Sequence, residues 1–465
     1  MTSSAATVAV HQTETLLFFT LLQLTVIILV ARLGGGIAQR LGQSPAVGEI
    51  VVGILLGPSL FGVLAPAVFA YVFHSAPPAP MQMLSQIGLI LLMFQIGLEF
   101  DFAHLLDRHH RRAVVYVATA SMVVPFALGF GFGYATAALL SPGVDPLASA
   151  LFIATAFSIT ALPILGRMMI EFKITHQPIG VIAISAAAIN DVVGWLLLAL
   201  VTALALAQFN AAGFGLKVFL VAGYFLTWWF VVRPLMKRVV RIAQAGPAPT
   251  GEKAGRGKLT HNLLGILLAG IFISAIATYQ IGIFAIFGGF MMGVILYDEH
   301  ELIAAWKERI GHFVMVFFLP IFFTYTGLRT NIGSLDSVAA WGWCLLLIAL
   351  ATLGKFGGSY IAARWAGLSH QEGKVLGIMM NTRALMELIV INVGYDLGVI
   401  SQQVFTMLVL MAIFSTVITT PGLRRWLPGL GIGIYAVHPF HGGAEGIGKP
   451  AGQGVSVVAK LTSRK

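Results

Sequence analysis

Long stretches of this chain contain no Asp, Glu, Lys or Arg. They cover residues 50–98, 113–144, 259–297, 310–328 and 397–423. A helix needs about 20 apolar residues to cross the hydrocarbon core of a bilayer, and each stretch is about that long or longer. With 58% hydrophobic and 10% charged residues, the 465-residue chain is too apolar for a soluble domain of this size. The sequence therefore predicts an all-α polytopic membrane protein, in which the longest stretches fold back as helix pairs.

The alternation of apolar blocks with polar residues predicts about thirteen transmembrane helices. Their expected centres lie near residues 23, 53, 92, 126, 159, 193, 222, 269, 289, 319, 351, 386 and 412. Because Lys and Arg collect in cytoplasmic loops, the basic residues indicate the orientation. With the N-terminus outside, 24 of the 28 basic residues fall in cytoplasmic segments, and an odd number of helices places the C-terminus in the cytoplasm. The expected location is a bacterial inner membrane.

Polar segments divide the chain into three expected regions. Residues 1–14 form a short N-terminal extension, residues 15–425 the membrane domain, and residues 426–465 a Gly-rich cytoplasmic tail. A Pro- and Gly-rich basic segment near residues 242–259 is expected to be a flexible cytoplasmic linker between two halves. The net charge of +10 is scattered over short loops and does not form one basic face, which argues against nucleic acid as a partner.

The two halves contain similar short sequences in the same order. The pairs are GILL at 53–56 with GVIL at 293–296, GLEFD at 97–101 with GLRTN at 327–331, and TAL at 160–162 with RAL at 383–385. The members of each pair lie seven expected spans apart, so they cross the membrane in opposite senses. Such an inverted repeat is typical of secondary transporters with a site near the bilayer midplane. Short apolar matches also arise by chance, so these pairs alone leave the repeat open.

Asp191 lies in the middle of an expected span, in the sequence SAAAINDVVGW. A carboxylate inside a membrane is costly and usually faces a cavity or a partner. Away from water a carboxyl group favours its protonated form, whereas a bound cation favours the ionised form. We therefore expect Asp191 to hold a proton or a monovalent cation in turn; a structural carboxylate is the alternative. Asn190 is either a neutral oxygen ligand or a helix-packing residue.

Thr155, Ser158 and Thr160 precede Pro163 within another expected span. Proline removes a backbone donor and disfavours helix in the preceding residue, so the helix is expected to break here. Carbonyl groups freed at membrane depth are tolerated where they line protein or water, and there they can bind a cation. An ordinary proline kink is the alternative.

Three more charged residues are expected inside the membrane. Arg383 and Glu387 are spaced i,i+4, which predicts an ion pair with a mainly structural role. Lys355 lies deep in its span among small residues that permit close helix contact. Its ammonium group needs an anionic neighbour, for which Asp191 is the expected partner; a side chain this long can instead extend to the membrane surface.

These motifs resemble the monovalent cation:proton antiporter-2 family over about residues 15–425. They occur in family order as PAVGEIVVGILLGPSLFG, LLMFQIGLEFD, FSITALPILGR, SAAAINDVVGW, FGGFMMGVIL, LPIFFTYTGLRTNI, GKFGG and MNTRALMELIVINVG. The chain is most similar to the membrane domain of plant-type cation/H+ exchangers and their bacterial relatives. The resemblance implies a thirteen-helix fold, a homodimer, a core domain with two crossed broken helices, and elevator-like movement against a dimerisation domain.

The resemblance also implies roles for particular residues. It maps the substrate carboxylate onto Asp191, the variable residue before it onto Asn190, and the core lysine onto Lys355. The two broken helices map onto Thr155–Thr160 and Asn381–Glu387. The Asn-Asp pair resembles the electroneutral exchangers of the family.

Residues and resemblance together predict secondary active exchange of a monovalent cation for H+ by alternating access. The plant-type branch favours K+, and Na+ is the alternative. If Lys355 stays protonated, only Asp191 changes state, so exchange is electroneutral at 1:1. No cofactor is expected besides the transported ions. A gated cation channel would need a continuous pore, and a sodium-coupled symporter a roomy organic-anion site. An enzyme would need a catalytic dyad or metal cluster, and no paired intramembrane acids or His-rich motif occur.

Overall fold

A computed structural model gives the fold of this chain, and it contains helices and no strands in the part it describes. The described residues are 2–43, 45–75, 77–98, 111–160, 162–172, 174, 177–206, 211–245, 259–383 and 385–432. Most of the expected linker and tail therefore lie outside them.

The chain contains both long and short helices. The long ones are α1 (Thr2–Arg40), α5 (Ala79–Leu98), α6 (Arg111–Leu140), α9 (Pro178–Leu206), α12 (His261–Ile281), α16 (Val338–Trp365) and α19 (Gln402–Trp426). The short ones that matter below are α2 (Pro45–Leu56), α7 (Pro146–Ser158), α8 (Leu162–Glu171), α13 (Ala285–Val294), α14 (His300–Trp306), α15 (Leu319–Arg329), α17 (His370–Met380) and α18 (Leu385–Asp396). A further helix runs from α10 (Ala211–Thr227) through η3 (Trp228–Val232) into α11 (Arg233–Ala245).

Nine helices in the described ranges are long and apolar enough to cross a membrane, and a tenth results if one pair bent by 43° at residues 300–334 counts as a single span. The expected centres near 159, 289 and 386 fall on short or interrupted helices. The count of thirteen therefore remains a prediction. Large apolar side chains lie exposed along these helices: Leu33 of α1 is 66% exposed and Phe219 of α10 is 72% exposed. Such a surface suits contact with lipid.

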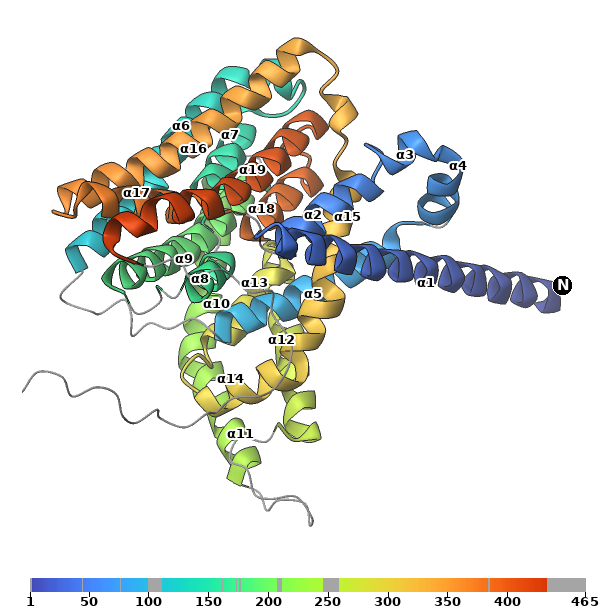
Figure 1. Cartoon of the computed structure of the whole chain (residues 1–465). Helices are drawn as coiled ribbons and strands as arrows, with labels where there is room; N and C mark the ends of the chain where they lie inside the picture. Colours follow the sequence, from blue (N-terminus) through green and yellow to red (C-terminus); the bar gives the residue numbers. More distant parts are fainter. Residues whose placement is uncertain are drawn as a thin grey trace, which may run out of the picture. The chain divides into compact units, whose positions relative to one another are not determined.

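The halves repeat the same helix packing. α1 packs on α2 as α12 packs on α13, and α6 packs on α7 as α16 packs on α17. The pair α2–α15 corresponds in the same way to the pair α13–α5. Figure 1 shows α6 and α16, which are equivalent in this scheme, running side by side.

Glycines from the similar sequences make the two equivalent contacts. A Cβ atom on Gly327 would lie 2.1 Å from the backbone carbon of Gly53, so α15 and α2 touch backbone to backbone. In the other half, a Cβ atom on Gly293 would lie 2.2 Å from the Phe94 carbonyl oxygen, beside Gly97. Gly53 thus contacts Gly327, the repeat equivalent of Gly97, and Gly97 lies beside Gly293, the repeat equivalent of Gly53. This reciprocal contact supports the internal repeat more strongly than the short sequence matches do.

Two spans are interrupted near their middle. α7 ends at Ser158, Ile159 is extended with φ −74° and ψ 145°, and α8 begins at Leu162. Pro163 therefore stands in the first turn of α8, where its missing N–H costs no intrahelical bond. In the second half α17 ends at Met380, and α18 begins only at residue 385. α7 packs against α18, so the two interrupted spans meet.

Candidate functional site

All eight residues singled out in the sequence are buried. Their exposed fractions do not exceed 1% for Thr155, Ser158, Thr160, Asn190, Asp191, Lys355, Arg383 and Glu387. They come from the end of α7 and the interruption after it, from the middle of α9 and of α16, and from the second interruption and the first turn of α18. Charged and polar groups at such depth must be satisfied by one another or by freed backbone groups.

Two basic side chains, Arg383 and Lys355, bind the C-terminal carbonyl groups of α7. Arg383 donates from Nη1 to the Ala156 oxygen at 2.9 Å and from Nη2 to the Phe157 oxygen at 2.8 Å. Lys355 donates from Nζ to the Ser158 oxygen. The last carbonyl groups of a helix lack intrahelical donors and carry the negative end of its dipole. The interruption of α7 thus creates an acceptor site that two side chains of the second half fill.

Arg383 is further anchored within its own half. Its Nη1 atom lies 3.0 Å from Glu387 Oε1, the contact that their i,i+4 spacing predicts. Its own carbonyl oxygen accepts the Thr416 hydroxyl at 2.6 Å. Thr416 was not identified from the sequence. Both terminal nitrogens of the Arg383 guanidinium and its carbonyl oxygen therefore have partners, which fixes the group in place.

Lys355 has a second carbonyl partner on α6. Its Nζ atom donates to the Ser121 oxygen at 2.8 Å. That carbonyl is free because its helical donor would be residue 125, and Pro125 has no N–H. Gly354 allows this approach, since a Cβ atom there would lie 3.1 Å from the Pro125 Cα. A proline inside an apolar helix is a sequence signal for a freed carbonyl four residues earlier.

The expected direct pairing of Lys355 with Asp191 is not present. Within the described residues the two side chains form no ion pair within 4.0 Å, because the ammonium is bound to the carbonyls of Ser121 and Ser158. Lys355 is also fully buried, so it does not extend to a surface. Lys355 still acts on Asp191 electrostatically, but it forms no direct hydrogen bond with that carboxylate.

Asp191 is the least satisfied of the buried charged groups. Neither carboxylate oxygen has a partner of ordinary hydrogen-bond geometry among the described residues. The Leu162 backbone at the start of α8 and the Lys355 charge act on it electrostatically. A helix N-terminus favours a negative group. A buried carboxylate with two open oxygens is able to take up a proton or an oxygen-preferring cation.

Asn190 lies in a small polar cluster beside Asp191. Its Nδ2 atom donates to Ser121 Oγ at 2.7 Å and to Thr160 Oγ1 at 3.3 Å. Its Oδ1 atom is buried and has no partner within the described ranges. In the part of the chain that the structure describes, the Thr155 hydroxyl donates to the Leu151 carbonyl of its own helix at 2.7 Å.

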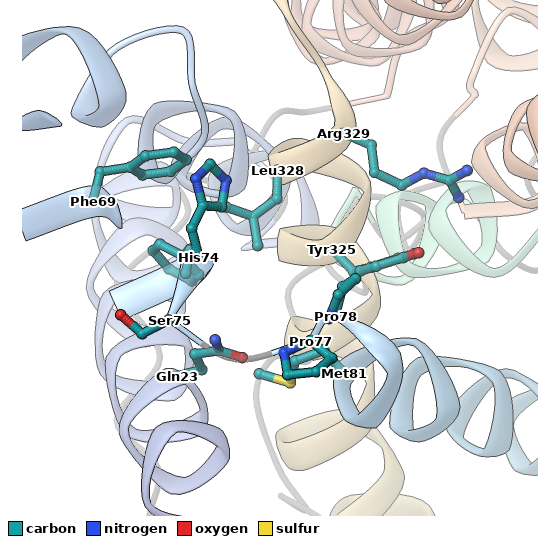
Figure 2. A pocket seen from close by; sticks show the side chains of 11 residues that line it. Gln23, Phe69, His74, Ser75, Pro77, Pro78, Met81, Tyr325, Leu328 and Arg329 are labelled. Carbon is teal, nitrogen blue, oxygen red and sulfur yellow. The ribbon is translucent and has the colours of Figure 1, made fainter. Parts of the chain in front are cut away.

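A cavity of about 730 Å³ lies apart from these residues. It is bounded by α1, the segment near His74 and the end of α15, and Figure 2 shows Tyr325 and Arg329 along its edge. None of the eight candidate residues lines it. Across the described ranges, no group of three or more His, Cys, Asp or Glu residues has the arrangement of a metal site.

Comparisons with known proteins agree on one family. A family model described as "Sodium/hydrogen exchanger, transmembrane" matches residues 25–428. The Na(+)/H(+) antiporter NhaS4 of a Synechocystis strain is 38% identical over 420 residues, which cover 90% of this chain and 98% of that protein. Cation/H(+) antiporter 17 of Arabidopsis thaliana is 37% identical over 86% of this chain, which spans only 47% of the plant protein.

A solved structure has the same fold. The sodium proton antiporter MjNhaP1 from Methanocaldococcus jannaschii aligns with a TM-score of 0.60 over 88% of this chain and 97% of its own, at 14% identity.

Proposed function

We infer from its membership of the transmembrane sodium/hydrogen exchanger family that this integral membrane protein exchanges a monovalent cation for protons, and we propose Asp191 as the group that carries the exchange. The observation that carries the proposal is the buried Asp191 carboxylate, whose oxygens have no hydrogen-bond partner of ordinary geometry among the described residues. The basic side chains of Lys355 and Arg383 are already bound to backbone carbonyl groups. A proton and a cation compete for these oxygens, because each neutralises the same charge.

The surrounding charges support a 1:1 electroneutral cycle. Arg383 is bound to Glu387 and to two carbonyl groups, and Lys355 is bound to two more. Asn190 does not titrate. With these groups constant, Asp191 alone changes state, so the site has the same charge whether it holds a proton or a monovalent cation.

We extend the proposal to a homodimer that works by an elevator-like alternating-access movement. Support comes from the family resemblance and from the packing, in which α6, α7, α9 and α16–α19 contact one another around the site. The distribution of Lys and Arg supports an N-terminus outside and a C-terminus in the cytoplasm, in a bacterial inner membrane. The proposal assigns no catalysed reaction and no cofactor to the chain.

Both Na+ and K+ are proposed substrates. Resemblance to the plant-type branch favours K+, whereas the Synechocystis relative is named as a Na+/H+ antiporter. Both ions take oxygen ligands, and their discrimination depends on ligand number and on the shape of the cavity.

Reconstitution into proteoliposomes tests the proposal. An imposed pH gradient should drive uptake of Na+ or K+, a reversed cation gradient should move protons, and Asp191→Asn should abolish both while the protein remains folded. Wild-type exchange rates in Asp191→Asn would remove this residue from the mechanism. Cation flux that needs no counter-moving proton would favour a gated channel. A balance point that shifts with a valinomycin-clamped voltage would contradict electroneutrality.

A further inference from the structure

Ser121 in α6 contacts two residues of the proposed exchange site, although it carries no charge and lies in a helix without a predicted role in the site. Its side chain is completely buried. Its hydroxyl oxygen lies 2.7 Å from Asn190 Nδ2, and its carbonyl oxygen lies 2.8 Å from Lys355 Nζ. The carbonyl contact exists because Pro125 leaves that oxygen without a helical donor. One residue thus joins α6 to both α9 and α16.

The hydrogen bond that Ser121 donates decides which end of the Asn190 amide faces it. The Ser121 hydroxyl lies 3.1 Å from the Ala118 carbonyl, which accepts and cannot donate. The single hydroxyl proton is therefore used, and the oxygen can only accept from Asn190. Asn190 must present its NH2 group to Ser121, so its carbonyl oxygen is turned away from Ser121.

The oxygen turned away from Ser121 is an acceptor on the residue that directly precedes the proposed cation-binding carboxylate in the chain. Asn190 Oδ1 is buried without a partner in the part of the chain that the structure describes, as are both oxygens of Asp191. A buried acceptor without a partner costs about 1–3 kcal/mol. A dehydrated monovalent cation at Asp191 offsets that cost, because it needs neutral oxygen ligands besides the carboxylate.

We propose that Ser121 is a positioning residue of the exchange site, whose hydroxyl orients the Asn190 side chain so that its oxygen becomes a ligand of the transported cation. This inference rests on the proposed function. Without the Ser121 acceptor, the amide keeps only the longer 3.3 Å contact with Thr160 and is free to rotate. Cation affinity then falls, while the protonation of Asp191 and the movement of the loaded carrier are retained.

The matched variants Ser121→Thr and Ser121→Val test the proposal, because Thr and Val have the same shape and differ in the hydroxyl group. In proteoliposomes, Ser121→Val should raise the KM for the cation about tenfold above that of Ser121→Thr, with maximal rates within about twofold. Thermal unfolding in detergent should be similar for both, since any crowding by the added methyl group is shared. Loss of rate at unchanged KM in Ser121→Val would overturn the proposal, since it indicates a packing role.

The pathway through Asn190 has its own test. In an Asn190→Ala background, Ser121→Val and Ser121→Thr should have the same KM, because Ser121 then has no amide to orient. A KM difference that persists in that background would overturn the proposal. Equal KM values for the two variants in the wild-type background, with active exchange, would overturn this inference alone. Absence of exchange in the wild-type protein would overturn the proposed function and this inference with it.

Discussion

The two interrupted spans occupy equivalent places in the repeat but differ in chemistry. The first presents oxygens: the carbonyl groups at the end of α7 and the hydroxyl of Thr160, beside Asn190 and Asp191 of α9. The second presents a guanidinium group, Arg383, at the position that Thr160 occupies in the first half, as the sequences TAL and RAL show.

The difference is complementary. Arg383 extends from the second interruption to the carbonyl groups at the end of α7. Lys355, which lies on α16 in the second half, binds a carbonyl group at the same helix end. Among the described residues, the first half thus holds a buried carboxylate without a hydrogen-bond partner, while the second half provides the two basic side chains that bind its carbonyl groups. An internal repeat of this kind can separate the exchangeable site from the charges that make it tolerable in a membrane.

Arg383→Met tests the fixed charge and should have the largest effect on stability. It removes the partner of Glu387 and of the α7 carbonyl groups, so we expect a loss of about 3–5 kcal/mol. Glu387→Gln should cost less, and the double variant should cost less than the sum because the two residues are in contact. Denaturant unfolding in detergent measures these values, with exposed Arg425→Met as the control. Strict additivity would show that the pair does not act as a unit.

Alanine in place of the contact glycines tests the equivalence of the halves. Gly327→Ala and Gly293→Ala should each cost about 1–3 kcal/mol, because the new Cβ atoms meet backbone at 2.1 and 2.2 Å. Gly131→Ala is the matched control, since its Cβ atom would meet nothing within 4 Å. In thermal unfolding, Gly327→Ala and Gly293→Ala should each have a lower melting temperature than Gly131→Ala. A large loss at only one of the two contacts would argue against the repeat.

Asp298→Asn should have the smallest effect on stability, since it concerns a partly exposed ion pair outside the repeated contacts. Asp298 accepts from Arg233 at 3.1 Å and from Lys237, which ties α11 to the segment before α14. Burial raises the pKa of the Asp298 carboxyl, but the hydrogen bond from Lys237 and the charges of Lys237 and Arg233 outweigh it and hold the pKa below its usual value.

The sign of the pH dependence follows. A carboxyl with a lowered folded-state pKa contributes stability above its unfolded pKa of about 3.9, and the contribution is lost as pH falls through the folded value. At neutral pH the free energy of unfolding of the wild type should exceed that of Asp298→Asn by less than about 1 kcal/mol. In a melting series in detergent, the difference should begin to shrink as pH falls below about 4 and should vanish once pH is below the folded-state pKa. A constant difference at all pH values would indicate a role other than charge.

The sequence predicted which residues form the site better than it predicted which atoms those residues bind. A lone Asp in an apolar span and a proline near three hydroxyl residues are strong local signals, and the structure buries Asp191 and interrupts the helix before Pro163. The matching glycines likewise predicted a repeat that the packing supports.

The hydrogen-bond acceptors of Lys355 could not be predicted, because backbone carbonyl groups have no residue type to identify them. Its acceptors are carbonyls freed by the end of α7 and by Pro125. Ser121 was missed for a related reason: a serine in an apolar helix is usually satisfied by its own backbone, and here that local bond to Ala118 is what makes it selective for a donor. Only the packing of α6 against α9 brings it to Asn190.

Proton release on cation binding tests most directly whether Asp191 holds a proton and a cation in turn. Purified protein in weakly buffered detergent solution is mixed with Na+ or K+ while pH and bound cation are followed together. Wild type should release about one proton for each cation bound, and Asp191→Asn should release none. Cation binding to the wild-type protein without proton release, or equal release from Asp191→Asn, would contradict the central claim.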